Sequence, residues 1–182
     1  MDKKNIVIGS AVGTAILSLG TVLYLNKRSS IPKGAEAVKP FDIKKYMGKW
    51  HEIARMDYLF EKNLDNATAE YSLNDDGSVK VINSGYNYKK SEKVESVGKA
   101  IFAGDPTEAK LKVSFWGPVY EGYNVIAIDK AYKYALVVGR NLNYMWLLSR
   151  ETSMPENIKN EYLQKAKELG YKTEKLVWSE HK

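Results

Sequence analysis

The sequence predicts an all-β protein, an eight-stranded up-and-down antiparallel barrel with one C-terminal α-helix packed on it. Three observations lead to this prediction. The chain of 182 residues contains 13 Tyr and 13 Gly and is 44% hydrophobic, a composition typical of strands and turns around a core. Short segments of alternating polarity recur roughly every ten residues, with turn signals between them. Only one stretch, near the C-terminus, has the pattern of an amphipathic helix.

Residues 1–26 precede the barrel and are predicted to be a transmembrane or signal-anchor helix. No charged residue lies between Asn5 and Asn26, and residues 6–25 are long enough to cross a bilayer as a helix. Residues 35–37 have the small-x-small pattern of a cleavage site, but they lie well beyond the apolar run, which favours retention of the segment. A cleaved signal peptide is the alternative. Basic residues at both ends of the segment leave its orientation open.

Residues 27–40 are predicted to be a linker, and residues 41–182 to form the barrel domain. The linker is polar and is interrupted by Pro32, Gly34 and Pro40, which do not favour a packed element. The barrel domain contains no internal repeat and no low-complexity tract. The sequence therefore indicates one folded domain behind the anchor.

Eight segments of the barrel domain are predicted to be strands: residues 49–57, 66–73, 79–88, 94–102, 109–116, 123–129, 134–139 and 144–150. The second and third are joined by residues 74–77, whose Asp-Gly pair provides the positive φ of a hairpin turn. In residues 110–115, Leu111, Val113 and Phe115 alternate with polar side chains and are expected on the buried face. Regular buried faces on consecutive strands favour one closed sheet.

The predicted helix follows the last barrel strand. Ser153 and Glu156 have the spacing of a capping box, and Gly170 marks the end of the helix. One apolar stripe, which is expected to pack on the barrel wall, consists of Ile158, Tyr162, Ala166 and Leu169. Residues 173–178 are predicted to form a last short strand.

Three motifs occur in order along the barrel domain. Gly48-x-Trp50 begins the first strand, Asp129 ends the sixth, and Arg150 ends the eighth. Together they resemble the signatures of the lipocalin family, although Asp129 is the only residue left of the usual Thr-Asp-Tyr of the second. The resemblance covers about residues 41–180 and is strongest toward the bacterial outer-membrane lipocalins and apolipoprotein D.

The resemblance implies a function as well as a fold. In lipocalins the arginine stacks on the tryptophan and closes one end of the barrel, so Gly48, Trp50 and Arg150 are expected to be structural. The family likeness implies that the chain carries or stores a fatty acid or a lysophospholipid at the bacterial cell envelope, with the barrel in the periplasm. Related lipocalins are usually acylated on an N-terminal cysteine, but this chain has no cysteine, so the peptide anchor is expected to replace the lipid. A homodimer is an open possibility.

If Trp50 and Arg150 point into the barrel, the alternate residues of their strands point inward as well. By alternation and family likeness, the expected ligand-binding residues are Ala54, Met56, Ala69, Tyr71, Val81, Ala100, Phe102, Val113, Phe115, Tyr123, Val125, Ala135, Val137 and Trp146. The alternative is that these side chains only fill the barrel. Glu52 is also expected to point inward, where its carboxylate needs a partner unless the alternation breaks there.

The composition favours a binding protein over an enzyme. The only two histidines are His51, which is outward by phase, and His181 in the tail, so no His-based triad, zinc site or haem ligand is expected, and no metal or other cofactor. Residues 1–40 hold a net charge of +4 of the total +6, so the body lacks the field that binds nucleic acid. Another small hydrophobic ligand, or an envelope enzyme acting on lipids, is the alternative function.

Overall fold

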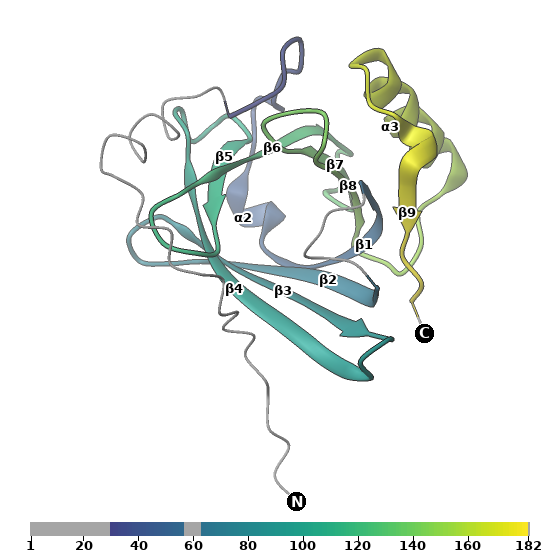
Figure 1. Cartoon of the computed structure of the whole chain (residues 1–182). Coiled ribbons are helices and arrows are strands. Elements are labelled where there is room, and N and C mark those ends of the chain that lie inside the picture. Colours follow the sequence, from purple (N-terminus) through teal and green to yellow (C-terminus); the bar gives the residue numbers. More distant parts are fainter. Residues whose placement is uncertain (1–29, 57–62, 182) are drawn as a thin grey trace, which may run out of the picture.

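Eight antiparallel strands follow one another round a closed barrel in the computed structural model, which describes residues 30–56 and 63–181 (Figure 1). Each strand pairs with the next, and β1 pairs with both β8 and β2, which closes the ring. The strands are β1 Gly48–Met56, β2 Leu64–Leu73, β3 Val79–Asn87, β4 Glu92–Phe102, β5 Lys110–Ser114, β6 Glu121–Ile128, β7 Tyr134–Val138 and β8 Met145–Ser149. The predicted eight-stranded up-and-down barrel is confirmed, with boundaries that differ by a few residues.

The C-terminal strand completes the barrel at one end. The first half of β1 pairs with β2, whereas its second half pairs with β9 Leu176–Trp178. The Asn66 amide donates to the Glu180 carbonyl at 2.8 Å, which joins this C-terminal segment to β2. Because η1 Thr173–Lys175 is a 3₁₀ turn, only the second half of the predicted last strand is extended.

The barrel wall separates the hydrophobic core into an inner and an outer cluster, and two β-bulges change which residues face each side. One lies in β1 between Glu52 and Ala54, and the other in β6 between Val125 and Ala127. A bulge shifts the alternation by one residue, so the side chains beyond it change faces. The inner cluster fills the barrel around Trp50, and the outer cluster lies between the barrel wall and the helix α3.

Helix α3 Glu156–Glu168 covers the outside of the barrel as predicted (Figure 1). Tyr162 and Ala166 are its buried residues, and Gly170 follows the helix end. The predicted capping box is wrong, because Pro155 occupies the N-cap and no side chain caps the helix. The Ser153 carbonyl instead accepts a hydrogen bond from Ser149 Oγ at 2.8 Å, which ties this turn to β8.

Residues 30–40 lie against the barrel, which corrects the expectation of a free linker. The Val38 amide donates to the Val125 carbonyl at 2.9 Å, and the Ser30 carbonyl accepts from Asn124 Nδ2 at 2.6 Å. A Cβ on Gly122 would lie 1.9 Å from the Ser30 carbonyl oxygen, so this approach requires glycine. Proline and glycine set the bends of the segment, but its backbone hydrogen bonds with β6 hold it in place.

The predicted membrane anchor, residues 1–26, lies outside the described residues. In residues 30–56 and 63–181, none of the helices combines the length and the apolar character needed to cross a membrane. The anchor stays a prediction from the sequence.

Candidate functional site

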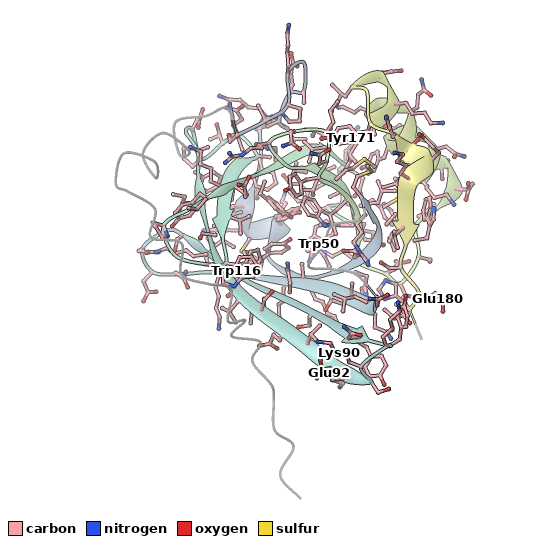
Figure 2. The ribbon with its side chains drawn as sticks, in the orientation of Figure 1. Trp50, Lys90, Glu92, Trp116, Tyr171 and Glu180 are labelled. Atoms are coloured by element: carbon pink, nitrogen blue, oxygen red, sulfur yellow. The ribbon has the colours of Figure 1, made fainter. Side chains whose placement is uncertain are left out.

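One end of the barrel is closed by the short helix α2 Ile43–Tyr46 and by Trp50. Figure 2 shows Trp50 inside the ring of strands, where its side chain is fully buried. Its indole Nε1 donates to the Tyr46 carbonyl at 2.8 Å, and its ring centroid lies 4.9 Å from that of Tyr46. The helix was not expected from the sequence, because four residues are too few to show a helical period.

Arg150 clamps this closed end. Its guanidinium carbon lies 4.0 Å from the Trp50 ring centroid, and burial lowers the pKa of the guanidinium below its ordinary value. Gly48 has a φ of +90°, and a Cβ there would lie 3.4 Å from Arg150 Nη1. The structure therefore brings Gly48, Trp50 and Arg150 together. The guanidinium also donates to the backbone carbonyls of Lys45, Tyr46, Met47, Lys49 and Tyr132.

Twelve of the fourteen expected ligand-binding residues belong to the inner cluster of the barrel. Most are buried, whereas Phe102, Val113, Phe115, Tyr123 and Trp146 keep some accessible surface. The twelve are Ala69, Tyr71, Val81, Ala100, Phe102, Val113, Phe115, Tyr123, Val125, Ala135, Val137 and Trp146. Val79 and Leu111 join them inside. Alternation had placed Leu111 on the buried face, although neither residue was among those expected to contact ligand.

Ala54 and Met56 are not in the barrel interior, which corrects their expected position. Both belong to the outer cluster beneath α3. The cause is the bulge in β1, where Glu52 pairs with Leu148 but Ala54 pairs with Leu147. The extra residue at the bulge shifts the inward–outward alternation by one position, so Arg55 points inward in place of Ala54.

A buried ion pair lies on the inner face near the other end of the barrel. Arg55 pairs in register with Trp146, is 1% exposed, and donates from Nη1 to Glu52 Oε1 at 2.5 Å. Glu52 also accepts from Ser179 Oγ at 2.6 Å. The carboxylate thus has partners, and the alternation breaks directly after it. Sequence reasoning missed Arg55, because its inward position depends on the bulge.

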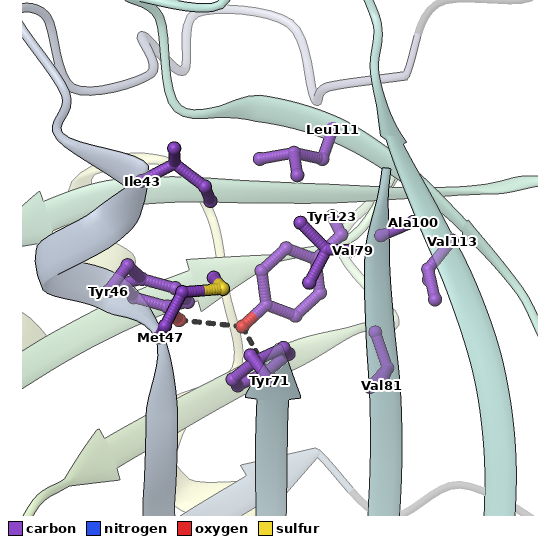
Figure 3. Close-up of a pocket in the computed structure, with 10 residues that line it drawn as sticks. All are labelled: Ile43, Tyr46, Met47, Tyr71, Val79, Val81, Ala100, Leu111, Val113 and Tyr123. Carbon is purple, nitrogen blue, oxygen red and sulfur yellow. Dashed lines mark hydrogen bonds between the residues drawn. The ribbon is translucent and has the colours of Figure 1, made fainter. Parts of the chain in front are cut away.

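Three tyrosine hydroxyls meet inside the barrel (Figure 3). Tyr123 OH lies 2.6 Å from Tyr46 OH and 2.7 Å from Tyr71 OH. Burial, reinforced by the neighbouring tyrosines, raises the pKa of Tyr123 well above its ordinary value. Burial likewise raises the pKa of Tyr46. The Tyr46 and Tyr123 hydroxyls therefore stay neutral and hydrogen-bonded at physiological pH.

The interior beside these tyrosines is closely filled. A void of about 10 Å³, room for roughly one water molecule, lies among apolar side chains that include Ile43, Val79 and Ala100 (Figure 3). Ligand pockets usually measure about 300 to 1,000 Å³, so a lipid needs side-chain movement to enter here. A larger, open groove of about 510 Å³ at the opposite end is lined by Arg55, Asn63, Leu64, Asp65, Tyr88, Val177, Trp178 and Glu180.

The two histidines lie together outside the inner cluster. Their ring centroids are 5.1 Å apart, and His181 Nε2 lies 2.7 Å from the Glu52 carbonyl oxygen. Burial, with added repulsion from His181 and Lys49, lowers the pKa of His51 below its ordinary value. Within the described parts of the chain, no group of three or more potential metal ligands occurs.

Comparisons with known proteins agree with this geometry. The family model of the lipocalin-like domain matches residues 41–181. The chain is 50% identical over 147 residues to outer membrane lipoprotein Blc of Citrobacter freundii, covering 81% of this chain and 83% of that protein. It is 30% identical over 164 residues to rat apolipoprotein D, covering 85% and 82% of the two chains. Insecticyanin of the tobacco hornworm shares the fold, with a TM-score of 0.69, 21% identity, and coverage of 85% and 88%.

Proposed function

The chain belongs to the lipocalin family, and we propose that it binds and carries a fatty acid or a lysophospholipid inside its barrel at the bacterial cell envelope. Binding of a small hydrophobic ligand is the function that the family membership supports. We infer the lipid class, and binding rather than catalysis, from the side chains that line this barrel.

The observation that carries the proposal is the polarity of the barrel interior along its length. The closed end beneath Trp50 is apolar and aromatic, whereas the opposite end carries the Glu52 and Arg55 side chains on the inner face and opens into the groove. A molecule with one alkyl chain and one polar group matches this division. Its chain would occupy the apolar interior, and its polar group would lie near the groove.

The filled interior makes lipid entry dependent on side-chain movement. Phe102, Val113 and Phe115 line the interior and retain accessible surface, so they are the side chains that a bound chain would displace. These three side chains make no hydrogen bonds, so they can change rotamer without breaking one. Tyr123 also lines the interior, but its movement would break its hydrogen bonds to Tyr46 and Tyr71. Phe102, Val113 and Phe115 can therefore make room for a lipid chain at no cost in hydrogen bonds.

The envelope location rests on the relatives and on the N-terminal sequence. The bacterial relative is named an outer membrane lipoprotein, whereas this chain contains no cysteine for acylation. Residues 1–26 are proposed to provide the membrane attachment in its place. Another small hydrophobic ligand is the second candidate, because the described residues of the inner cluster are mainly apolar and aromatic and would also contact other apolar molecules.

Titration with a fluorescent fatty acid and a fluorescent lysophospholipid tests the proposal. The full chain should bind at least one of them, and Val113→Trp should weaken that binding at least tenfold, because the larger side chain occupies the interior. Lys80→Ala is the matched control, since Lys80 lies exposed on β3 between the inward Val79 and Val81. A folded Val113→Trp protein that binds as tightly as wild type would place the lipid site outside the barrel. Turnover of a lipid ester by the purified chain would favour an enzyme instead.

A further inference from the structure

Tyr71 and Tyr123 reach across the barrel from opposite walls. Tyr71 lies on β2 and Tyr123 on β6, and three strands separate these two in either direction round the ring. Their hydroxyl oxygens are nevertheless 2.7 Å apart, and their ring centroids 5.9 Å apart (Figure 3). The two side chains thus form a hydrogen-bonded bridge through the interior.

Tyr46 braces this bridge from the closed end. Its hydroxyl lies 2.6 Å from that of Tyr123, and its ring centroid lies 5.4 Å from that of Tyr71. Tyr46 is itself held by Trp50, whose indole bonds to the Tyr46 carbonyl. We call Tyr46, Tyr71 and Tyr123 the tyrosine bar.

Insertion of the end of an alkyl chain between these tyrosines is energetically unfavourable. A methyl terminus accepts no hydrogen bond, so a chain that parts the tyrosines breaks both hydrogen bonds of the Tyr123 hydroxyl and replaces neither. An unpaired buried hydroxyl lowers affinity about 5- to 150-fold. One further buried methylene raises affinity only about fourfold. The void of about 10 Å³ that adjoins the bar is too small to add compensating contacts.

We propose that the tyrosine bar limits how deeply a lipid chain inserts into the barrel and so determines the longest chain that gains affinity. The inference rests on the proposed lipid-binding function and specifies the chain-length class of its ligand. Tyr71 and Tyr123 are specificity-determining residues in this account, and Tyr46 positions them.

The experiment measures dissociation constants of the full chain for the saturated series from octanoic to eicosanoic acid. For wild type, affinity should rise about fourfold per methylene and then stop rising at one length. The double variant Tyr71→Phe, Tyr123→Phe keeps both rings but removes the hydrogen bonds, so affinity should continue to rise for acids at least two carbons longer. Tyr162→Phe is the matched control, because its hydroxyl donates to the Tyr134 carbonyl at 3.1 Å outside the inner cluster.

The outcomes separate the inference from the function on which it rests. If wild type binds the series but the folded double variant stops at the same length, the bar does not set the limit, while lipid binding stands. If wild type binds no acid of any length and no lysophospholipid, the proposed function fails and the inference fails with it.

A measurement on wild type alone covers the case of a variant that does not fold. Hydroxyl protons held in the bar should exchange slowly with water in the NMR spectrum, and they should stay protected when an acid of the limiting length is bound. Loss of that protection on binding would show that the chain parts the tyrosines, and would overturn the inference.

Discussion

Replacement of Arg150 by alanine should destabilise the barrel by about 3 to 4 kcal/mol. The stack on Trp50, at 4.0 Å, accounts for about 0.5 to 2 kcal/mol. The hydrogen bonds from the guanidinium to the Lys45 and Lys49 carbonyls are exposed, so water can replace the guanidinium there. The Tyr46 carbonyl keeps the Trp50 indole as a donor, and the bond to the Tyr132 carbonyl is long, at 3.3 Å. The main loss is therefore the charged bond to the Met47 carbonyl at 2.7 Å, about 1.5 to 3 kcal/mol.

Urea unfolding followed by far-UV circular dichroism measures this loss as a lower midpoint with an unchanged slope. Arg150→Lys should recover about half of the free energy, because an ammonium keeps the charge over the ring but not the planar fork. Arg140→Ala is the control, since Arg140 pairs with the exposed Glu121 and bonds to the Tyr120 carbonyl, and it should cost less. An Arg150→Ala protein within about 0.5 kcal/mol of wild type would refute the clamp, since even its ring contact is worth that much.

Three further predictions concern other parts of the molecule. Arg55→Met should lower the free energy of unfolding in urea by about 3 to 5 kcal/mol, because Glu52 stays buried without its charged partner. The double variant Arg55→Met, Glu52→Gln should recover most of that loss. Equal stabilities of the single and the double variant would contradict the buried ion pair. The pKa of His51 in the folded protein lies below its ordinary value of 6.5, so the unfolded chain binds a proton at this residue more readily than the folded protein does. The free energy of unfolding should therefore fall as the pH drops below about 6.5. His51→Asn should make the free energy of unfolding depend less on pH in this range. The full chain should sediment with membranes and resist carbonate extraction, whereas recovery of a soluble chain lacking residues 1–30 would indicate a cleaved signal.

The barrel and most of its lining could be predicted from the sequence because both depend on a local pattern. Strand side chains alternate with a period of two, so Lys112 between Leu111 and Val113 already identifies the inner face. The resemblance of Gly48, Trp50 and Arg150 to the lipocalin signatures implied how one end of the barrel closes, and the structure brings the three residues together. The apolar stripe of α3 likewise follows from its helical period, and its Tyr162 is buried as expected.

Only the tertiary structure decided where the alternation breaks and which distant groups meet. The bulge in β1 depends on how that strand matches β8, so no window of sequence shows that Arg55 turns inward and Ala54 outward. The hydroxyls of Tyr71 and Tyr123 meet only because closure of the sheet sets β2 opposite β6. The space left inside the barrel is likewise the small difference between the volume that the strands enclose and the volume of the side chains that fill it. All the strands together determine this difference, so no local sequence pattern shows it.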